Sequence, residues 1–119
     1  MRERLAEFEL EARDDGVLIA RLGGEVDSSN ATELRLALTD RLPNASTALV
    51  LDLSRVVYID SSGVKLLFDL GRRLSARRQA LRLVVPEQAP TRRVLELCDV
   101  TDVAELDDSL DAALAALSS

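Results

Sequence analysis

Two short apolar runs constrain the fold of this chain more than any other feature. Residues 48–53 form a nearly continuous apolar block, and residues 81–85 form a second one. Runs of this length without regular polar alternation are typical of strands that are covered on both faces in the middle of a sheet. Between them, apolar residues from Val64 to Leu74 recur every three or four positions. This spacing predicts a helix that connects two parallel strands.

The N-terminal part of the chain predicts a hairpin followed by a helix. Residues 6–12 alternate between apolar and charged side chains, which is typical of a half-buried strand. Asp15-Gly16 predicts a turn and a second strand after it, so the hairpin covers about residues 5–23. The helix that follows is expected to have Ser28-Ser29 as its N-cap and to end before Pro43.

The C-terminal part predicts three more helices. The stretch SRVVYID is expected to be a short connection after the central strand, with the second helix beginning at the serines that follow. A short third helix carries Cys98 on its apolar face as a small core residue. Asp107-Asp108 are expected to cap a final helix whose apolar stripe begins at Leu106. The order β-β-α-β-α-β-α-(β)-α predicts an α/β fold with a mixed β-sheet, helices packed on it and one domain over residues 1–119.

Composition excludes several classes of function. The 119 residues include no histidine, which removes the imidazole base of most hydrolases and all histidine-containing metal sites. A net charge of −6 and an aromatic content of 3% argue against nucleic-acid binding. The lone Cys98 cannot form an intramolecular disulfide, and no stretch approaches a signal-peptide core or a membrane span. We therefore expect a cytoplasmic protein with no membrane contact, metal or cofactor.

The segment Tyr58-Ile59-Asp60-Ser61-Ser62-Gly63 is the candidate functional site, because a loop from a strand meets the first backbone amides of a helix there. In one interpretation Asp60 or Ser61 is an N-cap, and Gly63 lets the helix start close to the sheet. In the other, a serine accepts a phosphate that the helix dipole favours. The spacing alone favours the N-cap and permits both.

Three motifs then occur in order along the chain: Gly24-Glu25-Val26-Asp27, Leu51-Asp52-Leu53-Ser54 and Asp60-Ser61-Ser62-Gly63. With them the chain resembles, over essentially its whole length, the STAS-domain anti-sigma-factor antagonists of bacterial partner-switching systems. The resemblance implies the STAS fold and makes Ser61 the phosphoacceptor, with the neighbouring Ser62 as the less favoured one. It also implies that Asp27 and Asp60 lie beside the acceptor within a partner-binding surface.

The same resemblance implies how the protein works. The unphosphorylated chain binds an anti-sigma factor that doubles as a serine kinase, and a sigma factor is released. Phosphorylation of Ser61 breaks the complex, a serine phosphatase restores it, and the chain itself is not an enzyme. The residues expected to contact the partner are Asp27, Asp60, Ser62, Gly63, Leu66 and Leu70. Leu66 and Leu70 are included because they lie off the predicted core stripe of the second helix, although a wide core face would explain them equally well.

Other functions remain open from the sequence. A STAS module can instead dock within a transport, lipid-trafficking or stress-signalling complex without sigma-factor control. An enzyme could use Asp27 and Asp60 as paired carboxylates. A receiver domain with Asp52 as phosphoacceptor is disfavoured, because it needs a lysine at the end of its last strand and the only lysine, Lys65, falls in a predicted helix.

Overall fold

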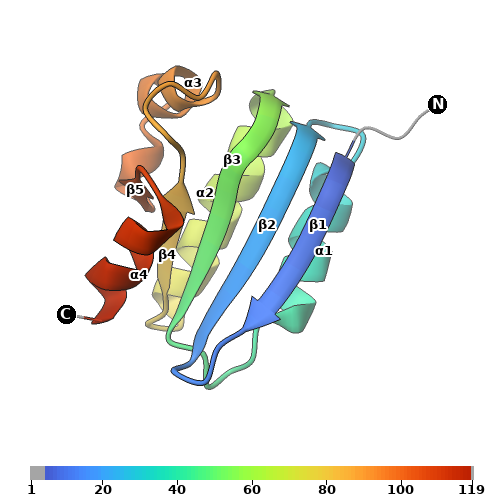
Figure 1. The fold of residues 1–119 in the computed structure, drawn as a ribbon. Helices are drawn as coiled ribbons and strands as arrows, with labels where there is room; N and C mark the ends of the chain where they lie inside the picture. Colours follow the sequence, from blue (N-terminus) through green and yellow to red (C-terminus); the bar gives the residue numbers. More distant parts are fainter. Residues whose placement is uncertain (1–4, 119) are drawn as a thin grey trace.

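A five-stranded mixed sheet organises the computed structural model, which describes residues 5–118 (Figure 1). The strands are β1 (Leu5–Ala12), β2 (Val17–Val26), β3 (Ala48–Ile59), β4 (Ala80–Val84) and β5 (Glu105–Asp107). They lie side by side in chain order, with β1 antiparallel to β2 and the other neighbours parallel. The predicted α/β class with a mixed sheet is therefore confirmed. Residues 1–4 and 119 of the predicted domain lie outside the described residues.

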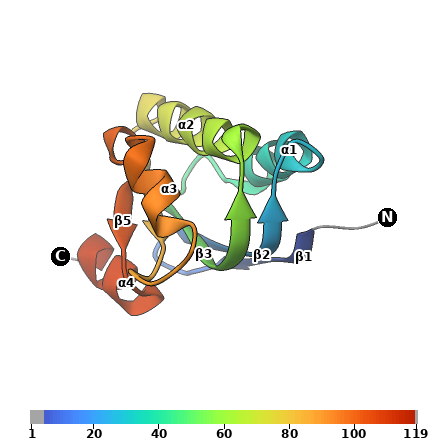
Figure 2. The same cartoon turned by 90° about the horizontal axis from the view of Figure 1, so that it is seen from above.

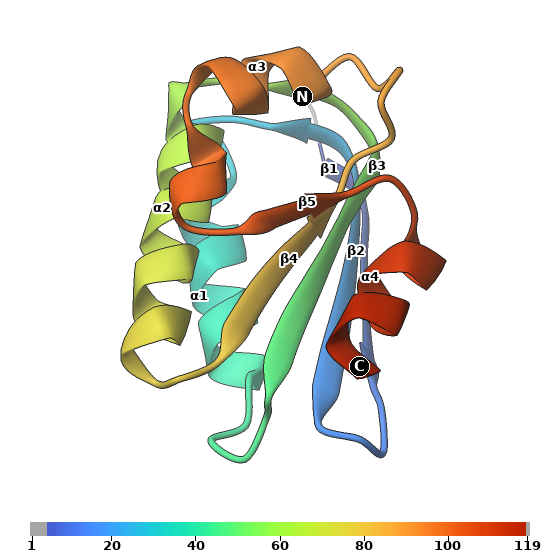
Figure 3. The same cartoon turned by 90° about the vertical axis from the view of Figure 1, so that its left-hand side faces the viewer.

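The helices pack on both faces of this sheet. They are α1 (Ala31–Arg41), α2 (Ser61–Ala76), α3 (Arg92–Leu97) and α4 (Leu110–Ser118), with a 3₁₀ turn, η1, at Val100–Asp102. Figures 2 and 3 show α1 and α2 side by side on one face and α4 on the other. The parallel strands β2, β3 and β4 follow one another in one direction across the sheet. Because crossovers between parallel strands are right-handed, the two connecting helices, α1 and α2, lie on the same face. Within residues 5–118, no helix has both the length and the apolar character that crossing a bilayer requires.

Two apolar clusters explain the continuous apolar runs in the sequence. The larger lies between the sheet and helices α1 and α2, where Leu38, Leu51 and Leu67 are almost fully buried. The smaller lies on the opposite face, where Val50 of β3 packs in one cluster with Ala113 of α4. Neighbouring residues of the central strands therefore enter different clusters, as the sequence predicts for strands covered on both faces.

The third strand is longer than predicted. The SRVVYID stretch is not a connection, because β3 continues to Ile59 and pairs with β2 as far as Val26. The register between the two strands shifts between Arg21 and Gly23 and again between Gly24 and Glu25. Such irregularities accommodate extra residues and disturb the alternation of side chains, so the segment resembles a loop in sequence.

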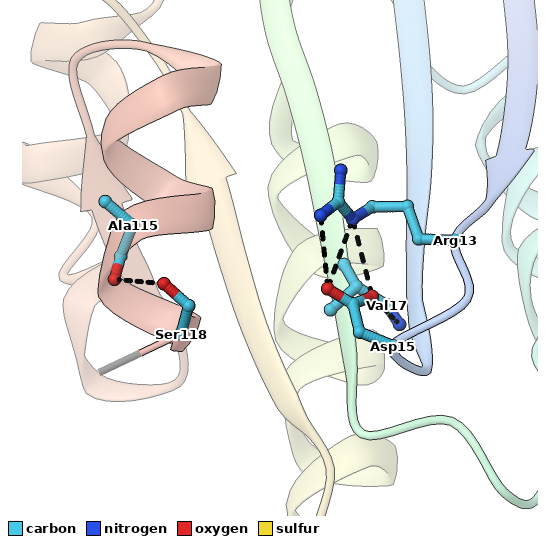
Figure 4. Close-up of polar contacts among 5 residues, drawn as sticks. All are labelled: Arg13, Asp15, Val17, Ala115 and Ser118. Atoms are coloured by element: carbon cyan, nitrogen blue, oxygen red, sulfur yellow. Dashed lines mark hydrogen bonds and ion pairs between the residues drawn. The ribbon is translucent and has the colours of Figure 1, made fainter.

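The predicted turn between β1 and β2 is confirmed, and polar contacts close it. Gly16 has φ +89°, a left-handed conformation that suits glycine. The Asp15 carboxylate accepts hydrogen bonds from the Val17 amide at 3.2 Å and from the Arg13 guanidinium at 3.2 Å (Figure 4). The hydrogen bond from Arg13 lowers the pKa of Asp15.

The same view shows the Ser118 hydroxyl donating to the Ala115 carbonyl within α4.

Two predicted helix caps are wrong. Helix α1 begins at Ala31 after Asn30, so Ser28-Ser29 precede the N-cap position. Before the last helix, Asp107 belongs to β5 rather than to a cap, and the Ser109 hydroxyl accepts the Ala112 amide. Asp107 pairs with Arg82 and Asp108 pairs with Arg92, and not with the helix amides that the sequence pattern suggests.

Two further core assignments differ. Leu106 lies in β5 and packs against the larger cluster, whereas α4 contributes to the smaller one. Cys98 follows α3 and is exposed, so its assignment to the core is wrong. Helix α3 has only six residues, and Leu95 alone among them is buried. A helix of that length presents too short a face to bury a second apolar position at its end.

The short strand β5 is attached by a partly buried ion pair. Arg82 on β4 binds Asp107 through two hydrogen bonds of 2.8 and 2.9 Å, and the Asp107 side chain is 10% exposed. We expect Asp107→Asn to lower the free energy of unfolding by about 1–3 kcal/mol, because it leaves the Arg82 guanidinium without its anion. Urea denaturation measures this.

Glu96→Gln is the matched control, since the carboxylate of Glu96 is 53% exposed and pairs with Arg92 on the surface. Its effect should stay within about 0.5 kcal/mol. Equal losses in the two variants would contradict a structural role for the pair on β5.

Candidate functional site

The predicted site residues follow the ends of two neighbouring parallel strands. Val26, the last residue of β2, pairs with Ile59, the last residue of β3. Asp27 and Asp60 therefore begin adjacent loops at the same edge of the sheet, where α1 and α2 also start (Figure 2). Open α/β sheets commonly bind their ligands at this edge.

Asp60 joins the two loops. Its Oδ1 accepts hydrogen bonds from the amides of Ser62 at 2.9 Å and Gly63 at 3.1 Å, so Asp60 is the N-cap of α2. Its Oδ2 accepts the amide of Ser28 in the β2–α1 loop at 3.3 Å. The Asp60 amide in turn donates to the Val26 carbonyl at 3.3 Å. The predicted capping role of Asp60 is confirmed, and the same carboxylate also positions the neighbouring loop.

Gly63 allows α2 to start against the sheet. A Cβ atom at this position would lie 2.4 Å from Cγ1 of Ile59 and 2.8 Å from the Val26 carbonyl oxygen. Both distances are shorter than van der Waals contact, so a larger residue would move the helix start away from β2 and β3. Gly63 is buried, so the expectation that it lets the helix start close to the sheet is confirmed, whereas its expected contact with a partner is not supported.

A compact hydrogen-bonded loop surrounds Asp27. Asp27 Oδ1 accepts the amide of Ser29 at 2.9 Å and its hydroxyl at 2.5 Å. The side chain of Asn30 accepts the Asp27 amide at 3.0 Å and donates to the Glu25 carbonyl at 2.8 Å. Sequence reasoning missed Asn30, although an asparagine just before a helix is a known signal for such a contact. The network holds Asp27, a half-buried residue, next to the Asp60 loop.

The two serines differ in their surroundings. Ser61 is the first residue of α2 and is exposed, whereas Ser62 is half-buried. Ser62 lines a groove of about 200 Å³ between α1 and α2. The other residues of this α1–α2 groove are Ala31, Thr32, Arg35, Lys65, Leu66 and Asp69. Of the two hydroxyls, that of Ser61 is the more accessible to another protein.

Leu66 and Leu70 do not form a docking surface. Their side chains are 3% and 1% exposed and belong to the larger core cluster. Helix α2 contacts α1 as well as the sheet, so its buried face is wide and includes positions outside a simple stripe. The prediction that these leucines contact a partner is wrong, and the alternative of a wide core face is confirmed.

An exposed apolar pair lies just before the site. Val57 and Tyr58 are 61% and 50% exposed, and both precede Ser61 by a few residues on the last part of β3. The sequence analysis included Tyr58 in the candidate segment but missed the exposed pair as a surface, because it assigned the segment to a connecting loop. Two adjacent apolar residues are unusual in a solvent-exposed loop, and this doublet could have indicated an exposed strand surface.

Comparison with known proteins gives a consistent result. The family model described as the STAS domain matches residues 10–113. BtrV of Bordetella bronchiseptica, named as a candidate anti-sigma factor antagonist, is 35% identical over 86% of this chain and 87% of its own. The anti-sigma-F factor antagonist RsfB of Mycobacterium tuberculosis is 32% identical over 87% of this chain and 83% of its own. The crystal structure of an anti-sigma factor antagonist from Mycobacterium paratuberculosis superposes with a TM-score of 0.83 at 30% identity, over 95% of this chain and 94% of that one.

The hydrogen bonds of Asp60 predict how the site responds to substitution. We expect Asp60→Ala to lower the free energy of unfolding by about 1–2 kcal/mol, because the first amides of α2 and the Ser28 amide lose their acceptor. Asp60→Asn keeps one side-chain oxygen and should lose less. Thermal and urea unfolding measure both.

The control is Asp40→Ala, which removes an exposed carboxylate from α1. Its effect should stay within about 0.5 kcal/mol. Asp60→Ala with no greater effect than Asp40→Ala would refute the bridging role of Asp60.

Proposed function

The chain belongs to the STAS-domain family, as an anti-sigma factor antagonist, and we propose that it binds its anti-sigma factor through the surface around Ser61. The observation that carries this proposal is an exposed serine hydroxyl on the first residue of a helix whose start is fixed by Asp60 and Gly63. Asp60 and Ser62 are its neighbours in sequence, and Asp27 begins the adjacent loop, which Asp60 contacts through Ser28. An exposed serine at a helix start that is itself held in place suits both docking and modification by a partner.

The bound anti-sigma factor acts as a serine kinase on this hydroxyl. The Ser61 oxygen attacks the γ-phosphorus of ATP held by the partner, and a new oxygen–phosphorus bond forms. The bond between the γ-phosphorus and its bridging oxygen breaks, ADP leaves, and the hydroxyl proton passes to a base of the kinase. In this reaction the chain is the substrate and not the enzyme, and it needs no cofactor of its own.

The phosphate weakens the complex through its charge. The amides of Ser62 and Gly63 already bind Asp60, so they are not available to the new anion. A phosphate of about −1.5 to −2 charge would then be buried at the interface beside the Asp60 carboxylate. Taking such a charge out of water at an interface costs several kcal/mol even when one surface cation pairs with it, and each 1.4 kcal/mol is about a tenfold loss of affinity. Because Asp60 continues to cap α2, the fold need not change.

A serine phosphatase completes the cycle by removing the phosphate from the exposed Ser61. While the chain is unphosphorylated it occupies the anti-sigma factor, and the sigma factor is free to act. Since sigma factors act on transcription, we assign the chain to the cytoplasm, in contact with proteins rather than with nucleic acid or membrane.

A docking subunit of a transport or lipid-trafficking complex is not favoured. Relatives at 32% and 35% identity over most of the chain bear the names of anti-sigma factor antagonists. An enzyme built on Asp27 and Asp60 lacks support as well, because both carboxylates accept backbone amides of their own loops.

Phosphorylation by the cognate kinase tests the switch. With ATP, we expect one phosphate at Ser61, located by mass spectrometry. Ser61→Ala should abolish the modification, while Ser62→Ala should retain it. Ser61→Asp should weaken the complex with the anti-sigma factor by about 100-fold in calorimetric titration, because a fixed negative charge enters the interface. A phosphate at any other residue would overturn the assignment.

We propose that Val57 and Tyr58, which are exposed on β3 a few residues before Ser61, supply an apolar anchor for the partner. Tyrosine is one of the residue types enriched among the few residues that dominate binding energy at protein interfaces. The pair lies on the last part of β3, whose pairing with β2 continues to Ile59. We therefore include both side chains in the surface that the anti-sigma factor covers.

Truncation of the aromatic ring tests this anchor. Tyr58→Ala should weaken binding of the anti-sigma factor by about tenfold or more without lowering the unfolding temperature, since the ring is already 50% exposed. Leu36→Ala is the control, because Leu36 is similarly exposed, at 48%, but lies within α1 and not on β3. Equal effects of the two variants would remove Tyr58 from the interface.

A further inference from the structure

Lys65 follows Ser61 by four residues, and residues with this spacing lie next to each other on a helix surface. Its ammonium group forms an ion pair with Asp69 at 3.0 Å, with side chains 75% and 32% exposed. We infer that phosphorylation of Ser61 moves Lys65 from Asp69 to the phosphate, so that Lys65 positions the phosphate on α2. This inference concerns the regulation of the proposed site and rests on the proposed function for its biological meaning.

The geometry of the helix favours the exchange. An acidic group four residues before a lysine pairs better than an acidic group four residues after it. Asp69 stands in the weaker arrangement and phosphorylated Ser61 would stand in the stronger one. The phosphate also carries about −1.5 to −2 charge, against −1 for the carboxylate. Helical side chains lean toward the N-terminus of their helix, which directs Lys65 toward the turn of Ser61.

The exchange costs the protein little. Lys65 is largely exposed, so turning its side chain removes no buried contact. Asp69 keeps a second cation, because the Arg72 guanidinium lies 3.7 Å from its carboxylate. Arg72 is itself held over the ring of Phe68, 5.4 Å from the ring centroid. Only one exposed ion pair is lost, and such pairs contribute little to stability.

The charges around Lys65 define what a partner would meet. Across the α1–α2 groove lies Arg35 of α1, and Asp69 lines the same groove from α2. Asp60 directly precedes Ser61, and Asp27 begins the adjacent β2–α1 loop. When Lys65 turns to the phosphate, the surface charge changes over the stretch of α2 between Ser61 and Asp69, which is about 12 Å long. A partner lying over the groove would therefore meet a different surface in the phosphorylated form.

The first test follows Lys65 directly. Phosphoserine is incorporated at position 61 during synthesis, so the result does not depend on which residue a kinase selects. Lys65 is the only lysine of the chain, and selective ¹³C labelling of lysine therefore gives one side-chain signal by NMR. We expect this signal to shift with phosphoserine at position 61 and to stay in place with phosphoserine at the exposed Ser75, ten residues beyond Lys65.

The second test measures the effect on the phosphate. Lys65 stabilises the dianion, so the second pKa of phosphorylated Ser61 in a ³¹P NMR titration should be about 0.3 pH units lower in the parent chain than in Lys65→Gln. Lys65→Arg should restore the lower value, and Arg73→Gln, which removes an exposed charge farther along α2, should leave it unchanged.

The two tests separate this inference from the proposed function. An unmoved lysine signal together with the same phosphate pKa in the parent chain and in Lys65→Gln would overturn the role of Lys65, whatever the kinase does. If a kinase modifies another residue but both NMR results hold, the proposed function fails while the pairing stands as a property of the helix.

Discussion

The Asp60 carboxylate is the contact on which the candidate site depends. One oxygen accepts the first free amides of α2, and the other accepts an amide of the β2–α1 loop. A single side chain thus satisfies donors that a helix start and a loop would otherwise leave without partners. Without it, the start of α2 and the loop that carries Asp27 would lose the side-chain link between them. Ser61 can be exposed and still well positioned because its neighbour in sequence makes these contacts.

The close packing of α2 against the rest of the fold is the second feature that fixes the position of the site. Gly63 at its start and Gly71 in its middle both lack room for a side chain, the first against Ile59 and the second against Val103. The helix is therefore in backbone contact with the sheet at one end and with the segment after η1 farther along. This packing explains why Leu66 and Leu70 are buried although the sequence pattern left them outside the stripe.

The parts of the fold that were predictable are those set by regular local patterns. The apolar runs of β3 and β4 and the glycine turn at Gly16 each depend on a few adjacent residues, and the structure confirms them. The errors concern contacts between distant residues. The bulged end of β3 follows from pairing with β2, and Asp107 is recruited by Arg82 rather than by a helix. The exposure of Ser61 was predictable from its position, whereas the link from Asp60 to Ser28 was not, because it spans 32 residues.

The arrangement of α2 separates stability from signalling. Its buried leucines and glycines face the core and the sheet, while Ser61, Lys65 and Asp69 follow one another at four-residue spacing along another face. A phosphate on that exposed face changes charge without disturbing a buried contact, since the cap is already made by Asp60. Association can then change by orders of magnitude while the free energy of folding stays nearly constant. A switch that unfolded α2 would instead have to overcome the packing of the whole core, which is a far larger energy than one phosphate supplies.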